Sequence, residues 1–107
     1  MGVFEDAVKE FDEVLEVVKT AVISHQGRKF RIEVERNYSN DKIKYSAGYW
    51  ELRNVFVTPE FDERGTQYSG SPVRMRIWQQ VNLPWVARDS ADGAMSQALG
   101  FLLSTNF

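Results

Sequence analysis

Few side chains in this chain could support acid–base or metal chemistry, and their spacing does not bring them together. His25 is the only histidine, so no second imidazole shares a metal ion with it. Asp12 and Glu16 are four residues apart and could pair their carboxylates, but such pairs act on metals or protons only when they are buried or held by neighbouring groups. We expect both acids on the polar side of a surface helix, where neither condition holds.

Motifs for nucleophilic catalysis or phosphate binding do not assemble either. The chain has no cysteine, which excludes disulfides, thiolate nucleophiles and zinc–thiolate sites. Gly65, Gly70 and Gly93 lack the nearby lysine and the strand-to-helix context of a nucleotide-binding loop, and no serine lies in a nucleophile-elbow pattern. We therefore predict a protein that is not an enzyme and has no catalytic residue, no metal site and no cofactor.

The strongest binding signal is a row of residues that alternate along residues 73–81. As a strand, this segment directs Arg74, Arg76, Trp78 and Gln80 outward and Val73, Met75, Ile77 and Val81 inward. Arginine and tryptophan are enriched at interface centres, because arginine pairs in planar geometry and tryptophan buries a large area at small entropic cost. We predict that Arg74, Arg76 and Trp78 bind a partner, with Arg31 and Tyr45 as flanking candidates on neighbouring strands.

Other interpretations of this row stay open. Trp78 could be covered by the long loop before it or by Trp85, and the arginines could pair with Glu33 and Glu35 across the sheet. Arginine and tryptophan could also neutralise and stack single-stranded nucleic acid. The net charge of −2 argues against a general nucleic-acid or membrane binder, and residues 1–20 hold six acids against two lysines.

Periodic segments must position these residues. Apolar residues recur at helical spacing over residues 3–23 and predict one long amphipathic helix. Gly27 follows it and, as a glycine, can adopt the left-handed conformation that commonly ends a helix. Phe30, Ile32 and Val34 alternate with charged residues and predict a strand, and further strands are expected over residues 43–57 and 73–81. Ser90 is a suitable N-cap for a final helix that ends near residue 104.

The connections between these segments carry their own signals. Residues 38–42 contain turn-forming side chains and predict a hairpin between the first two strands. Gly48 lies where the apolar phase of residues 43–57 changes sides, which predicts a bulge or bend that turns both apolar sets toward the core. Residues 58–72 are polar and rich in turn formers, and we expect them to be disordered.

Together these segments predict one α+β domain over residues 1–107. Its order is α-β-β-β-α, with a three-stranded antiparallel sheet that has both helices on one face and nothing on the other. The composition is that of an ordinary globular protein, with 43% hydrophobic residues. The longest apolar run is too short to cross a bilayer and the N-terminus is acidic, so we expect a cytoplasmic protein without a membrane partner.

This order of elements resembles that of the double-stranded RNA-binding domain, and the run Ala91-Asp92-Gly93-Ala94-Met95-Ser96-Gln97-Ala98-Leu99 is similar to the alanine-rich start of that family's second helix. The likeness in topology covers most of the chain. It implies a sheet with both helices on one face and, in function, RNA binding. The family's lysines at the start of its final helix are replaced here by Arg88, Asp89, Ser90 and Asp92, so no RNA-contacting residue carries over.

The sequence therefore favours a small non-enzymatic protein-binding or adaptor domain that acts through its open sheet face. A partner protein or a second copy of the chain, as in a homodimer, would cover that face. The alternative is a domain that binds RNA or single-stranded DNA with the same residues.

Overall fold

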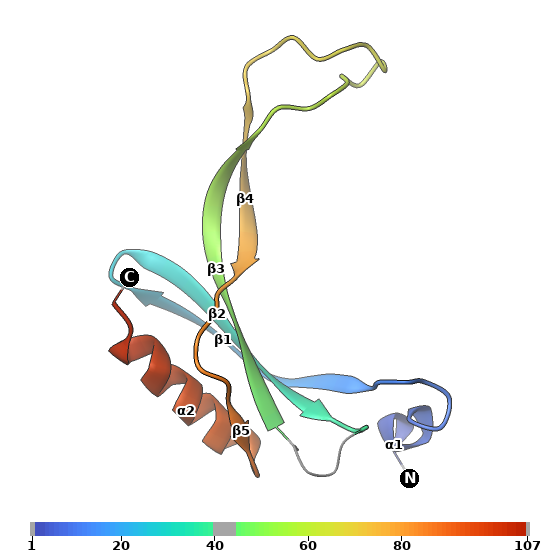
Figure 1. Ribbon diagram of the computed structural model, residues 1–107, viewed down its shortest axis with the longest axis vertical. Coiled ribbons are helices and arrows are strands. Elements are labelled where there is room, and N and C mark those ends of the chain that lie inside the picture. The colour runs from blue at the N-terminus through green and yellow to red at the C-terminus, as the bar shows by residue number, and fades with distance from the viewer. Residues whose placement is uncertain (1, 40–44, 107) are drawn as a thin grey trace.

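An open antiparallel sheet dominates the structure, a computed structural model that describes residues 2–39 and 45–106 (Figure 1). The elements are α1 (Val3–Ala7), β1 (Leu15–His25), β2 (Arg28–Asn37), β3 (Tyr45–Val57), β4 (Val73–Gln80), β5 (Ala87–Arg88) and α2 (Ala91–Ser104). The strand order is β1-β2-β3-β4, and the short β5 pairs with the opposite end of β3. The α+β class is confirmed, whereas the prediction of three strands is wrong.

The N-terminal third of the chain accounts for that error. The predicted helix over residues 3–23 is a single helical turn followed by strand β1, which pairs along its length with β2. A β-bulge between Val17 and Lys19 shifts the phase of β1, so its sheltered residues include Val18 and Ala21, three apart. That spacing imitates a helix, but the β-branched residues of this segment favour a strand once β2 is available to pair with it.

The turn between β1 and β2 has a conformation that its residues explain. Gln26 and Gly27 both have positive φ, 53° and 75°, as a two-residue hairpin with the twist of its strands requires. Gly27 therefore adopts the expected left-handed conformation, but in a hairpin and not after a helix. The other turn predicted from the sequence, over residues 38–42, lies mostly outside the described residues.

Strand β3 is continuous, and the bulge predicted at Gly48 is absent from it. The register between β2 and β3 runs unbroken from Phe30 opposite Glu51 to Arg36 opposite Tyr45. The change of apolar phase therefore places residues on both faces of the sheet. Gly48 serves a different purpose, because a Cβ atom there would lie 2.6 Å from the Trp50 ring. The glycine leaves room for that ring to lie along the strand.

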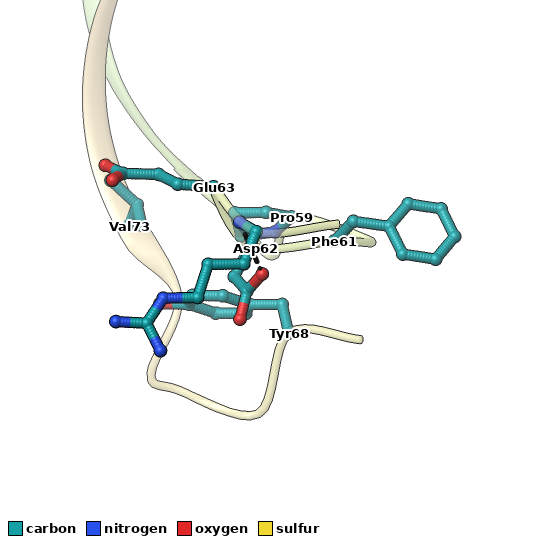
Figure 2. Close-up of a pocket in the computed structure, with 7 residues that line it drawn as sticks. Pro59, Phe61, Asp62, Glu63, Tyr68 and Val73 are labelled. Atoms are coloured by element: carbon teal, nitrogen blue, oxygen red, sulfur yellow. Dashed lines mark hydrogen bonds between the residues drawn. The ribbon is translucent and has the colours of Figure 1, made fainter. Parts of the chain in front are cut away.

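The distal part of β3 and most of β4 form a hairpin, residues 52–78, that we call the arm. Figure 1 shows the arm projecting away from α2 and from the β1–β2 strands. The tip, residues 58–72, was expected to be disordered but forms a defined turn. Asp62 Oδ1, drawn in Figure 2, accepts a hydrogen bond from the backbone N–H of Arg64 at 2.8 Å. It also accepts one from the backbone N–H of Thr66 at 2.9 Å, and Gly65 has a φ of 79°.

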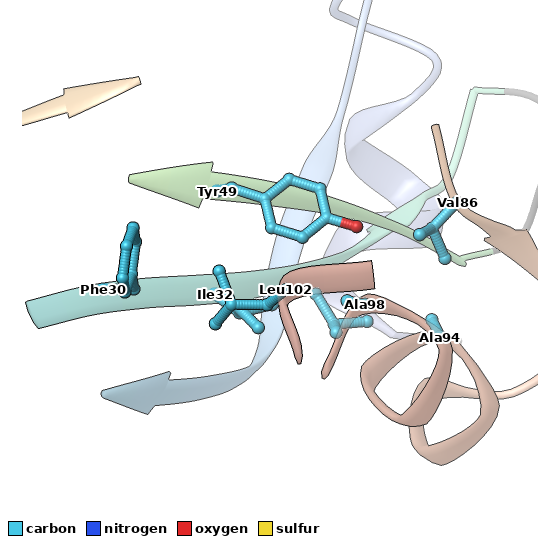
Figure 3. Close-up of a cluster of buried hydrophobic side chains, with 8 residues drawn as sticks. Phe30, Ile32, Tyr49, Val86, Ala94, Ala98 and Leu102 are labelled. Atoms are coloured by element: carbon cyan, nitrogen blue, oxygen red, sulfur yellow. The ribbon is translucent and has the colours of Figure 1, made fainter. Parts of the chain in front are cut away.

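The hydrophobic core lies between α2 and the body of the sheet (Figure 3). As predicted, Phe30, Ile32 and Val34 are buried on one face of β2, with at most 1% of each exposed. They pack with residues of the neighbouring elements, namely Tyr49, Val86, Ala94, Ala98 and Leu102. The final helix also follows the prediction, since Ser90 Oγ accepts a hydrogen bond from the Gly93 N–H at 3.0 Å and the helix ends at Ser104.

Of the two helices in the described residues, only α2 covers the sheet. The helix α1 lies at the end of the sheet, where its Phe4 ring stacks on Tyr38 with 5.2 Å between centroids. The prediction of two helices on one face is therefore wrong, because the residues expected to form the first of them are strand β1. Neither helix has the length or apolar character needed to cross a bilayer within residues 2–39 and 45–106.

Candidate functional site

The face of the sheet opposite α2, which we call the open face, carries the candidate site. Paired residues on neighbouring antiparallel strands share a face, so the register assigns each side chain to one side. On the open face, β2 contributes Arg31, Glu33 and Glu35, β3 contributes Trp50, Leu52, Asn54 and Phe56, and β4 contributes Arg74, Arg76, Trp78 and Gln80. In the described part of the chain, no helix lies over this face.

At the centre of the open face, a guanidinium lies between two tryptophans. Arg31 Cζ is 5.0 Å from the ring centroid of Trp50 and 4.8 Å from that of Trp78. Both distances fall within the range of cation–π attraction, which strengthens as water is removed. Three neighbouring strands supply one residue each. The register explains how they meet, because Arg31 pairs with Trp50, and Trp78 pairs with Leu52 two residues further along β3.

Acidic side chains adjoin this cluster on the body of the sheet. Arg31 Nε lies 3.0 Å from Glu33 Oε1, an ion-pair contact without hydrogen-bond geometry. Further along β2, burial raises the pKa of the Glu35 carboxyl, and the charges of Glu33 and Glu13 add to that effect. The open face is therefore acidic toward the end of β2 that lies away from the arm.

The arm half of the open face is basic and aromatic. Arg74 and Arg76 are exposed, and Arg74 Nε donates a hydrogen bond to Asn54 Oδ1 at 3.2 Å. Phe56, which pairs with Arg74, is 72% exposed. Trp78 is half-buried and lies on the same face as both arginines. Neither the tip loop nor Trp85 buries it completely.

Four of the five candidate residues share this face, and the fifth does not. Arg31, Arg74, Arg76 and Trp78 all lie on it, whereas Tyr45 lies on the α2 side, half-buried against the core. The expected position of Tyr45 beside the arginine row is wrong. In the observed register, Tyr45 pairs with Arg36 and Arg88 at the far end of β3.

Trp50, Leu52 and Phe56 belong to the open face and were missed as site residues. The available signal was the change of apolar phase in β3. It places Trp50 and Phe56 on one face of the sheet and Tyr45 and Ala47 on the other. From sequence alone, this change predicts a bulge or bend that returns them to the core. Without a helix over the second face, the phase change instead supplies that face with aromatic side chains.

A buried carboxylate anchors the base of the arm on the α2 side. The side chain of Glu51 is only 4% exposed, and it accepts hydrogen bonds from Arg28 Nη2 at 2.6 Å and from Arg53 Nε at 2.7 Å. Arg28 Nε also donates to the same carboxylate. The hydrogen bond from Arg28 is the main cause that lowers the pKa of Glu51, despite its burial. These bonds join β2 to the first residues of the arm.

The tip of the arm contains a pocket of about 490 Å³. Its lining includes Pro59, Asp62, Tyr68 and Val73, whereas the ring of Phe61 points outward (Figure 2). The Asp62 carboxylate is occupied by backbone N–H groups of its own loop. Across the described residues, no three histidine, aspartate or glutamate side chains converge as metal ligands would.

No family model, curated protein or solved structure matches this chain. The candidate function therefore rests on the geometry of the open face.

Proposed function

We propose that this chain is a small non-enzymatic protein-binding domain, which self-associates and holds a partner protein on its open face. The observation that carries the proposal is the Arg31 guanidinium held between Trp50 and Trp78. Interface centres favour tryptophan and arginine whose side chains are already ordered, because little conformational entropy is then lost on binding. This cluster is such a preorganised centre on a face that no helix of the described chain covers.

The charges around the cluster define the partner. Arg74 and Arg76 extend along the arm on one side, and Glu33 and Glu35 lie along β2 on the other. A partner that matches both regions presents acidic groups to the arm and basic groups to β2, with an apolar residue against Trp78 between them.

Nucleic acid, which the resemblance to the RNA-binding family implies, is the alternative partner of the same face. Phe56 and Trp78 could stack bases while Arg74 and Arg76 neutralise phosphates. Glu33 and Glu35 weigh against it, because a nucleic acid that continued along the face would bring its phosphates to these carboxylates.

The test is a variant that combines Trp78→Ala with Arg76→Ala. Hot-spot truncation costs about 2 kcal/mol or more, which is roughly 30-fold in Kd. We expect the double variant to lose proteins that the wild type captures, with an unchanged circular dichroism spectrum. The matched control is Gln79→Ala, since Gln79 directly follows Trp78 in β4 but lies on the α2 side.

Two results would contradict the proposal. Identical sets of captured proteins from the wild type and the double variant would show that the open face is not the binding surface. Tight binding of labelled single-stranded RNA that falls steeply with added salt, as phosphate neutralisation requires, would instead support the nucleic-acid alternative.

A further inference from the structure

The α2 side of the arm is apolar, and α2 does not reach it. The register places Val55, Val57, Val73, Met75 and Ile77 on this side, and we call these five residues the arm strip. Val55 is half-buried, and the other four are between 38 and 48% exposed. From sequence alone, Val73, Met75 and Ile77 were expected to face the core. They do lie on the same face of the sheet as the core, but the arm extends beyond α2, so the helix does not cover them.

The arm also lacks support from other strands. Pairing of β2 with β3 ends at Phe30 opposite Glu51, so the remainder of β3 pairs only with β4. A two-stranded hairpin is marginally stable when nothing packs on it. The extension is large, since the radius of gyration is 18.6 Å and a compact domain of this length has about 13 Å. The arm therefore extends well beyond the compact core.

We propose that the arm strip packs face to face against the arm strip of a second copy, with the two arms antiparallel across a two-fold axis. The axis passes near Val55 and Met75, which are paired at the middle of the strip. The inference rests on the self-association in the proposed function and names the surface responsible for it. It does not depend on what the open face binds.

The size of the strip suits a dimer of this kind. Its exposed fractions correspond to roughly 300 Å² of apolar surface in each copy, or about 600 Å² in the pair. A specific interface of about 1,000 Å² therefore also includes the polar residues that flank the strip. The strip itself contains no charged residue. Two identical uncharged surfaces bring no like charges together, so the strip is compatible with its own copy.

Charges at the two ends of the arm favour the antiparallel orientation. The tip holds Glu60, Asp62 and Glu63 against a single arginine, Arg64, and is acidic. The base holds the cluster of two arginines on the Glu51 carboxylate and is basic. With the axis at the middle of the strip, Arg53 of one copy faces Val57 of the other, just before the acidic tip begins. The basic base of each copy then lies toward the acidic tip of the other, so this attraction forms twice, once on each side of the axis.

The open face is poorly suited to the same role. An antiparallel pairing through that side of the arm would place Arg74 and Arg76 of one copy against the same arginines of the other. Like charges directly opposed are destabilising. Self-association therefore uses the arm strip and leaves the open face to a different partner.

Neighbouring residues of β4 provide a matched test, because Met75 and Arg76 are adjacent in the chain and lie on opposite faces. Sedimentation of the purified protein over a range of concentrations measures the dimer Kd. We expect Met75→Glu to raise this Kd at least 10-fold and Arg76→Glu to leave it within about twofold. Loss of the dimer in Arg76→Glu but not in Met75→Glu would move self-association to the open face and overturn the inference, while the proposed function stands.

A crosslinking experiment avoids a buried charge and covers the case in which Met75→Glu disturbs the arm. The chain has no cysteine, so Met75→Cys and Arg76→Cys each introduce a single thiol. Facing sheets are about 10 Å apart, beyond the reach of a disulfide but within that of a short bis-maleimide. We expect crosslinked dimer from Met75→Cys and little from Arg76→Cys. Equal crosslinking would indicate pairing along the β4 edge, and a monomer at every concentration would refute self-association itself. Both results would overturn the inference, and neither affects binding by the open face.

Discussion

Replacement of Glu51 by glutamine tests whether a buried carboxylate stabilises the base of the arm. The change keeps the size of the side chain, removes its charge and turns an amide N–H₂ toward donors from Arg28 or Arg53. Disruption of a fully buried ion pair costs about 3–5 kcal/mol. Here the side chains of Arg28 and Arg53 are 34 and 47% exposed, so water can solvate them after the change. We therefore expect a loss of about 2 kcal/mol in the free energy of unfolding at pH 7.

The pH dependence of this loss has a definite sign. Hydrogen bonds from Arg28 and then Arg53 lower the pKa of Glu51 in the folded state below its ordinary value of 4.5. A carboxylate of this kind contributes stability above its unfolded pKa, and the contribution disappears as the pH falls through the folded pKa. The difference between wild type and Glu51→Gln should therefore be largest at neutral pH and should shrink below pH 4.5.

Urea unfolding followed by circular dichroism at pH 7 and pH 3 measures both effects. By thermal unfolding, a loss of about 2 kcal/mol corresponds to a decrease of roughly 10 °C in Tm for a domain of this size. The control is Asp92→Asn, which breaks the exposed ion pair between Asp92 and Lys19 (2.7 Å) and should change little. A Glu51→Gln protein as stable as this control at pH 7 would refute the argument for a stabilising buried carboxylate.

Three further substitutions test the packing around the site and the core. Gly48→Ala places a methyl group against the Trp50 ring, which should displace the ring and shift the tryptophan emission to longer wavelength, and unchanged emission would contradict the close approach. Leu102→Ala removes a side chain that is 2% exposed, and we expect a loss of about 3 kcal/mol in urea unfolding, whereas under 1 kcal/mol would mean that α2 packs loosely. Ser90→Ala removes the N-cap bond to Gly93 and should cost about 1 kcal/mol in the same assay.

The errors of the sequence interpretation are concentrated where helical and extended patterns resemble each other. The bulge in β1 places sheltered residues three apart, and acids precede it as they would at a helix N-terminus. A pattern with this spacing is ambiguous on its own. The pairing of β1 with β2 decides between the two structures, because that pairing supplies backbone hydrogen bonds and places Val18 and Ile23 against the core.

Local signals in the sequence were sufficient to predict β2, α2 and the face on which each residue of β4 lies. Strict alternation around Ile32, the cap at Ser90 and the alternation from Arg74 to Trp78 are properties of short segments, and the structure contains each of them. Such signals act within a few residues, so distant parts of the chain do not alter them. By itself, the sequence thus determined that Arg74, Arg76 and Trp78 share a face away from the core helix.

Only the tertiary structure decided what surrounds that face. The β2–β3–β4 register brings Arg31 between Trp50 and Trp78 and sends Tyr45 to the other side. The reach of α2 determines which apolar residues are covered, and it leaves those of the arm strip exposed. Register and reach depend on contacts between segments far apart in the chain. For that reason alternation could predict on which side Met75 lies, but not whether anything would cover it.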